Sequence, residues 1–96
     1  MLENKFQADL IKELKQMLPD CIVMKNDAGY IQGIPDLLIL NHDRWASLEV
    51  KKTMNARRRP NQEYYVNRMN IMSFAKFICP ENKDDILHEL CKFFSV

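Results

Sequence analysis

The chain has 96 residues, a formal net charge of +1, 47% hydrophobic residues and 28% charged residues. This length fits one domain over 1–96 with a modest core, and the composition is that of a globular protein rather than a disordered or collagen-like chain. There is no apolar run near the length of a membrane-spanning helix, no secretory signal pattern and no Cys-x-x-Cys spacing. We therefore expect a cytoplasmic protein with reduced thiols and no contact with a membrane.

The spacing of apolar residues predicts three helices and four strands. The first helix is amphipathic and is ended by Pro19-Asp20, and Pro60 suits the first turn of the second helix. This order, αβββαβα, predicts an α/β fold with a mixed four-stranded sheet flanked by helices. In chain order we expect a helix over 4–18, strands over 21–24, 36–40 and 45–52, a helix over 61–69, a strand over 73–79 and a helix over 81–94.

The segment between the first two expected strands is rich in turn-forming residues, Asn26-Asp27-Ala28-Gly29-Tyr30. It leads directly into Gly33-Ile34-Pro35-Asp36. Either it lies over a site built at that motif, or it is a simple hairpin connection. The sequence leaves both interpretations open.

Three charged residues stand at the two central strands. Asp36 opens one apolar strand, and Glu49 and Lys51 lie two residues apart on the next. Alternate residues of a strand point the same way, so Glu49 and Lys51 share a face while Ala46, Leu48 and Val50 face the core. Charges beside a hydrophobic sheet are costly unless they pair or bind something. Two carboxylates and an amine suit a hard divalent cation and an activated water.

The motif resembles the core of the PD-(D/E)XK nucleases, through Pro35-Asp36 followed by Glu49-Val50-Lys51. With Gly33-Ile34 before it, Leu48 before Glu49 and the later Gln62, it is most similar to the VRR-NUC branch, whose short members are often phage-encoded. Archaeal-type Holliday junction resolvases are similar around the same residues. The resemblance spans nearly the whole chain in order. It implies a restriction-endonuclease-like core and a Mg²⁺- or Mn²⁺-dependent DNA endonuclease, placed in the host cytoplasm if phage-encoded.

The resemblance also implies roles for individual residues. Asp36 and Glu49 would bind one or two Mg²⁺ or Mn²⁺ ions, with the backbone carbonyl of Val50 as a further ligand. Lys51 would orient the attacking water, help to deprotonate it, or stabilise the charge that builds on the phosphate. Gln62 would help to position water or the lysine.

Nucleases of this superfamily often add a third carboxylate from the first helix. On a helical wheel Glu3 projects into the apolar stripe of that helix, and Glu13 lies at its edge. Glu3 is therefore our choice for the third carboxylate, and Glu13 is the fallback. As an alternative, Asn4 and Gln7 form a capping pair, which leaves Glu3 outside the helix as a partner of its dipole.

A run of basic residues without acids follows the motif. On a chain that is nearly neutral, such a local patch fits a phosphate-binding surface, although most such runs are solvated loops. The neighbouring motif favours contact with DNA phosphates. The residues expected to make it are Lys52, Arg57, Arg58 and Arg59.

We therefore predict a metal-dependent endonuclease that hydrolyses phosphodiester bonds in DNA. The resemblance favours branched or four-way-junction DNA over linear duplex, and a homodimer that sets two sites against two strands. One alternative is a non-catalytic nucleic-acid-binding module with the same fold. The other is an interaction protein in which Asp36, Glu49 and Lys51 form a mere ion-pair network.

Overall fold

The computed structural model describes residues 3–95, which form three helices and four strands. The order αβββαβα and the α/β class confirm the prediction, with element ends shifted by a few residues. The helices are α1 (Glu3–Met17), α2 (Pro60–Met72) and α3 (Lys83–Phe94), and the strands are β1 (Ile22–Lys25), β2 (Leu37–Asn41), β3 (Arg44–Val50) and β4 (Ala75–Ile78).

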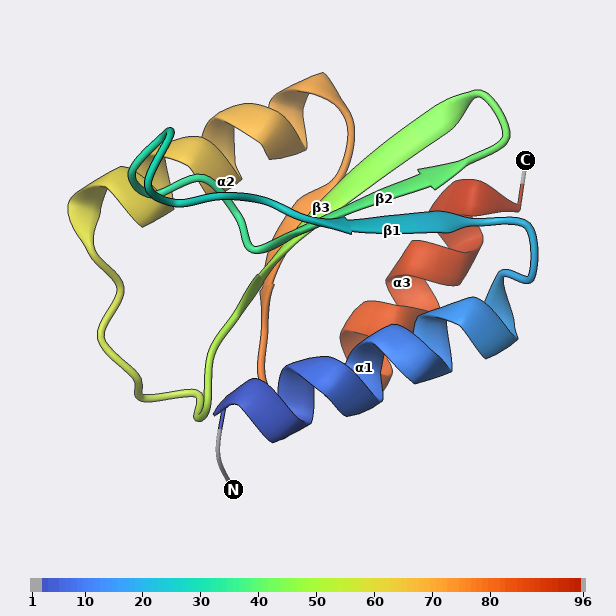
Figure 1. Ribbon diagram of the computed structural model, residues 1–96, viewed down its shortest axis with the longest axis horizontal. Coiled ribbons are helices and arrows are strands. Elements are labelled where there is room, and N and C mark those ends of the chain that lie inside the picture. Colours follow the sequence, from blue (N-terminus) through green and yellow to red (C-terminus); the bar gives the residue numbers. More distant parts are fainter. Residues whose placement is uncertain (1–2, 96) are drawn as a thin grey trace.

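The four strands form one mixed sheet in the order β1-β2-β3-β4 (Figure 1). The pairs β1–β2 and β2–β3 are antiparallel, and β3–β4 is parallel. Antiparallel neighbours can be joined by short turns, whereas a parallel pair needs a crossover, and α2 lies in that crossover between β3 and β4. The mixed sheet expected from the sequence is therefore confirmed.

Helices α1 and α3 cover one face of the sheet, and α2 covers part of the other (Figure 1). The alternation expected for β3 is confirmed, because Leu48 and Val50 are fully buried in the core with α1 and α3. Glu49, between them, points to the opposite face, where Gln62 of α2 bonds to it. The main core residues are Phe6, Leu10, Leu14, Leu37, Ile39, Ala46, Leu48, Val50, Ile78, Leu87, Leu90 and Phe94.

Strand β1 lies at the edge of the sheet and is the least covered strand. Its Ile22 and Met24 side chains are 59% and 47% exposed, and only Val23 packs against the core. Helix α2 packs on β3 and β4 and so does not shield this edge. An uncovered edge strand keeps backbone groups that can pair with another strand.

The three cysteines, Cys21, Cys79 and Cys91, are free thiols. Within residues 3–95, no helix has both the length and the hydrophobicity that crossing a bilayer requires.

Candidate functional site

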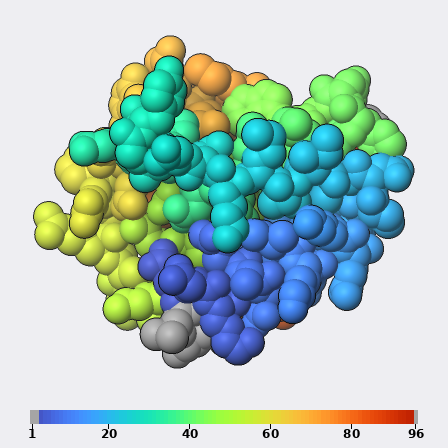
Figure 2. Space-filling model, in the orientation of Figure 1, coloured from blue at the N-terminus to red at the C-terminus, as the bar shows by residue number. Residues whose placement is uncertain are grey.

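A cleft of about 460 Å³ opens where β3 ends. Its walls come from the first turn of α1, Asp36 just before β2, the end of β3, the loop over 51–59 and the first turn of α2. Figure 2 shows this side of the molecule, where the blue start of α1 meets the yellow-green loop. The structure thus brings together five residues that the motif singled out: Glu3, Asp36, Glu49, Lys51 and Gln62.

Asp36 is held in place from two neighbouring strands. Pairing between β2 and β3 ends at Leu37, so the Val50 amide has no backbone partner there, and it donates to Asp36 Oδ2 at 2.8 Å. On the other side, the Asn26 amide donates to the Asp36 carbonyl at 2.8 Å. The Asn26 side chain also donates to the Pro35 carbonyl at 2.8 Å. These hydrogen bonds fix one carboxylate oxygen of Asp36. Because both oxygens belong to the same carboxylate, the bonds also limit the direction of the second oxygen.

Glu49 is a buried acid, with only 4% of its surface exposed. Burial, followed by the nearby charge of Asp36, raises its pKa to about 8, although the ammonium of Lys51 opposes the rise. Without a cation, Glu49 therefore carries a proton at neutral pH. A divalent cation beside both carboxylates would favour the ionised form of each. Without a cation, the positive charge near Asp36 and Glu49 does not offset the cost of ionising Glu49.

Gln62 connects the acid to the base. Its Nε2 donates to Glu49 Oε2 at 3.2 Å, and its Oε1 accepts from Lys51 Nζ at 2.8 Å. The same oxygen accepts from the Arg59 amide at 3.0 Å, which also stabilises the start of α2. Lys51 Nζ makes a second hydrogen bond, to the Arg57 carbonyl at 3.0 Å. The position of Lys51 is therefore set by the loop and by α2 together.

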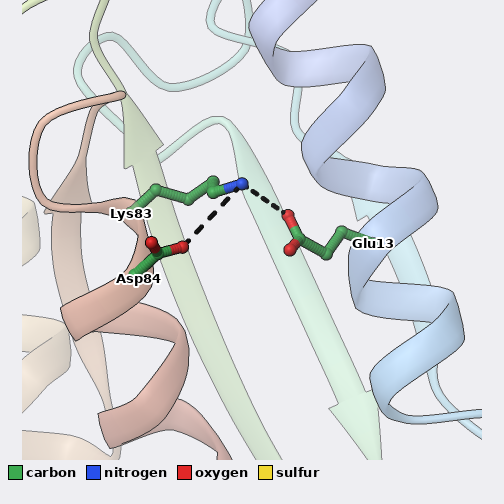
Figure 3. Close-up of polar contacts among 3 residues, drawn as sticks. All are labelled: Glu13, Lys83 and Asp84. Atoms are coloured by element: carbon green, nitrogen blue, oxygen red, sulfur yellow. Dashed lines mark hydrogen bonds and ion pairs between the residues drawn. The ribbon is translucent and has the colours of Figure 1, made fainter.

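The two candidates for a third carboxylate lie in different places. Glu3 is the first residue of α1 and lines the cleft, so the alternative that leaves it outside the helix is wrong. Glu13 forms an ion pair with Lys83 of α3 at 2.9 Å (Figure 3). Within residues 3–95, however, no three His, Cys, Asp or Glu side chains form a cluster that could hold a metal. Glu3 is thus a lining residue beside the closer pair of Asp36 and Glu49.

Because Glu3 and Glu13 lie in different places, we expect their substitutions to have different effects. For the metal-dependent cleavage that the sequence motif predicts, we expect Glu3→Gln to lower the rate by about tenfold, because it removes one negative charge from the cleft. Glu13→Gln should leave cleavage unchanged and cost about 1 kcal/mol of stability or less, since its ion pair is partly exposed. Cleavage rates and urea unfolding of both variants check this. Loss of cleavage in Glu13→Gln alone would contradict it.

Three of the four predicted DNA-contacting residues line the cleft: Lys52, Arg57 and Arg59. Arg58 points elsewhere, with its guanidinium carbon 4.0 Å from the centre of the Phe77 ring. It lines a different hollow, together with Glu63 of α2. Its neighbours Arg57 and Arg59 line the cleft instead. The basic wall of the cleft therefore consists of Lys52, Arg57 and Arg59.

Gly33 sets the distance between the β1–β2 connection and α2. Its φ is +88°, a left-handed conformation, and an added Cβ would lie 2.8 Å from the backbone carbon of Asn61. We expect Gly33→Ala to cost about 2–4 kcal/mol, from backbone strain and from the displacement of α2. Gly29→Ala is the matched control, because its Cβ would meet only the Asp27 side chain, at 3.0 Å or more. Equal urea midpoints for the two variants would contradict this account.

Comparison with models of known protein families, with curated proteins and with solved structures finds no match for this chain. The described walls of the cleft hold carboxylates, amides and basic groups but no His or Cys. Oxygen donors of this kind fit Mg²⁺ or Mn²⁺ and do not fit a zinc site.

Asn26 and the Arg57 carbonyl are two partners that the sequence reasoning missed. Asn26 stands in the turn-rich segment before the motif, where an Asn that bonds to nearby backbone is common. The Arg57 carbonyl is a backbone group, and no residue type signals it. The Val50 amide donates a hydrogen bond to Asp36. The role of the Val50 carbonyl as a metal ligand stays a prediction.

Proposed function

We propose that this chain is a metal-dependent DNA endonuclease of the PD-(D/E)XK superfamily, with a restriction-endonuclease-like core of the VRR-NUC type. The observation that carries the proposal is Glu49, a buried acid beside the half-buried Asp36, joined through Gln62 to Lys51 in a cleft with a basic wall. A buried acid whose pKa is raised by burial and by a neighbouring carboxylate, next to an ammonium group, is an arrangement that functional sites use.

The residues that would hold Mg²⁺ or Mn²⁺ are Asp36 and Glu49, with the Val50 carbonyl and Glu3 as further oxygen donors. A bound ion supplies positive charge, which lowers the pKa of water and offsets the charge that develops on the phosphate. Magnesium keeps several waters when bound, so two close protein carboxylates suffice.

Lys51 acts as a fixed hydrogen-bond donor in this proposal. A charged lysine has three N–H donors, and two of them are used by Gln62 Oε1 and the Arg57 carbonyl. The third is left for the attacking water or for a phosphate oxygen. With two donors held by acceptors, the third N–H of Lys51 is placed to orient water and to stabilise charge in the transition state.

The basic wall of Lys52, Arg57 and Arg59 would hold the flanking phosphates. Contacts of this kind release counterions, so binding should weaken steeply as salt rises. A branched or four-way junction is the proposed substrate, and two copies of the chain would cut its two strands. The uncovered edge of β1 leaves a surface on which a second copy can pair.

An ion-pair network is less well supported than a metal site. Among residues 3–95, the ion pairs are Lys5–Asp9, Lys83–Glu13 and Lys83–Asp84, and none joins Lys51 to a carboxylate of the cleft. Lys51 bonds to an amide and a carbonyl instead. The second candidate is therefore the non-catalytic nucleic-acid-binding module, which the basic wall alone would serve.

The test compares a labelled four-way junction with a linear duplex of the same sequence, each in Mg²⁺, Mn²⁺ or EDTA. We expect paired nicks in the junction with either metal and none in EDTA. Lys51→Ala should bind the junction and cut it at least about 100-fold more slowly. Binding without cleavage in every metal would overturn the endonuclease and favour the binding module.

A further inference from the structure

A second hollow, of about 370 Å³, adjoins the cleft and shares two of its walls. Arg59 and Gln62 line both spaces. The β1–β2 connection, which includes Gln32 and Gly33, encloses the second space together with Asn61 of α2. Figure 1 shows this connection, in teal, reaching to the start of α2. The hollow is thus a side chamber that lies directly beside the cleft.

The connection that encloses the chamber is held by its own hydrogen bonds. Asp27 Oδ1 accepts from the Gly29 amide at 2.7 Å, and the Asp27 carbonyl accepts from the Tyr30 amide at 3.1 Å. Gly33 then brings the backbone against Asn61 with no room for a side chain. The chamber is therefore formed before any ligand enters, and its volume lies within the range of about 300–1,000 Å³ that small-molecule sites occupy.

The chemistry of the chamber differs from that of the cleft. Among the described residues that line it there is no acid, and Arg59 is the one charged side chain. Gln32 and Asn61 add carboxamides, each of which offers an acceptor oxygen and two donor hydrogens. Carboxamides can form paired hydrogen bonds with the edge of a base, and arginine binds phosphate. The lining thus matches one nucleotide, with its phosphate at the side of Arg59.

We propose that this chamber binds a single unpaired nucleotide next to the phosphate held in the cleft, and so makes the protein selective for DNA with unpaired nucleotides. The inference rests on the proposed nuclease function and names its substrate class more closely. A base in a duplex cannot enter without leaving its partner, which costs a few kcal/mol, whereas an unpaired base enters without that cost. The protein therefore prefers branch points, flaps or bulges with unpaired nucleotides to fully paired DNA, including a fully paired junction.

The test substitutes Gln32, because this residue is exposed and its replacement leaves the core intact. Gln32→Ala removes the carboxamide, and Gln32→Glu keeps the shape but adds negative charge. Tyr30→Ala is the matched control from the same connection. Tyr30 is large and exposed, but it lines a hollow formed with Ile31 and Ile34, not this chamber.

The experiment measures binding by fluorescence anisotropy in EDTA, so that no DNA is cut. The two probes are a labelled duplex and the same duplex with one unpaired nucleotide. We expect the wild type and Tyr30→Ala to bind the second probe about tenfold more tightly. Gln32→Ala should reduce that ratio to about threefold or less, and Gln32→Glu should reduce it further. Equal binding of both probes by the wild type, no measurable binding of either, or a loss in Tyr30→Ala alone would overturn the proposal.

Cleavage of both probes in Mn²⁺ distinguishes this inference from the function on which it rests. If the nuclease proposal fails, neither probe is cut, whatever the binding ratio. If only the chamber is wrong, both probes are cut at equal rates and bound equally.

Discussion

Glu49→Gln makes the metal-free protein more stable at alkaline pH and abolishes cleavage. The amide keeps the shape of the side chain and an acceptor for Gln62, but it has no charge to be buried. Burial and the charge of Asp36 raise the pKa of Glu49 to about 8 from its ordinary 4.5, and this sets the scale of the effect. At pH 9 we expect a gain on the order of 2–4 kcal/mol.

The sign follows from the direction of the shift. In the unfolded chain, Glu49 loses its proton near its ordinary pKa of 4.5, whereas in the folded chain it keeps it up to about pH 8. The unfolded state therefore binds fewer protons between these values, and the stability of the wild type falls as pH rises through that window. Below about pH 4.5 the penalty is absent, and above about pH 8 it is complete. Glu49→Gln removes this part of the pH dependence.

Urea unfolding of the metal-free proteins between pH 4 and pH 9 measures the effect. Glu89→Gln is the matched control, because Glu89 is an exposed acid on α3. We expect the control to follow the wild type, while Glu49→Gln diverges from it as pH rises. A variant that is less stable than the wild type at pH 9 would show that Glu49 is stabilised by its surroundings as an anion.

Asp36→Asn is expected to lower the rate of cleavage by about 10³-fold while the fold is kept. Asparagine retains an oxygen that can accept the Val50 amide, so the anchor between β2 and β3 survives. The negative charge is lost, and a hard divalent cation binds a neutral amide more weakly than a carboxylate. Single-turnover cleavage and calorimetric titration with Mn²⁺ measure the two effects.

Asp43→Asn controls for the general loss of one negative charge, because Asp43 lies exposed in the turn between β2 and β3. It should cleave and bind Mn²⁺ as the wild type does. If Asp36→Asn also cleaves DNA at the wild-type rate, Asp36 is not a ligand. The same Asp36 charge helps to raise the pKa of Glu49, so we also expect that pKa to fall in Asp36→Asn.

The order of elements was predictable because each one carries a local signal. Alternating apolar residues mark β3, Pro60 marks the start of α2, and the apolar stripe marks α1. The exposure of β1 was not predictable, because its apolar run does not say which strand lies at the edge of the sheet. Edge position depends on the pairing of all four strands, which is a tertiary property.

The main contents of the site were also predictable, because Asp36, Glu49 and Lys51 lie on or beside adjacent strands. The hydrogen bonds that link these side chains were not predictable. Gln62 reaches both Glu49 and Lys51 only because α2 begins opposite the end of β3. Arg58 could not be separated from Arg57 and Arg59 by sequence, since the three are adjacent and the direction of each depends on the loop.

The most direct test of the metal-dependent nuclease is a single-turnover cleavage assay with a labelled branched DNA and purified wild-type protein. Protein and DNA are mixed in EDTA, and Mn²⁺ is then added in steps beyond the chelator. The account predicts no product in EDTA, a rate that rises with free Mn²⁺ to saturation, and loss of that rate in Asp36→Asn. Cleavage that proceeds equally in EDTA, or no cleavage at any concentration of Mn²⁺ or Mg²⁺, would contradict it.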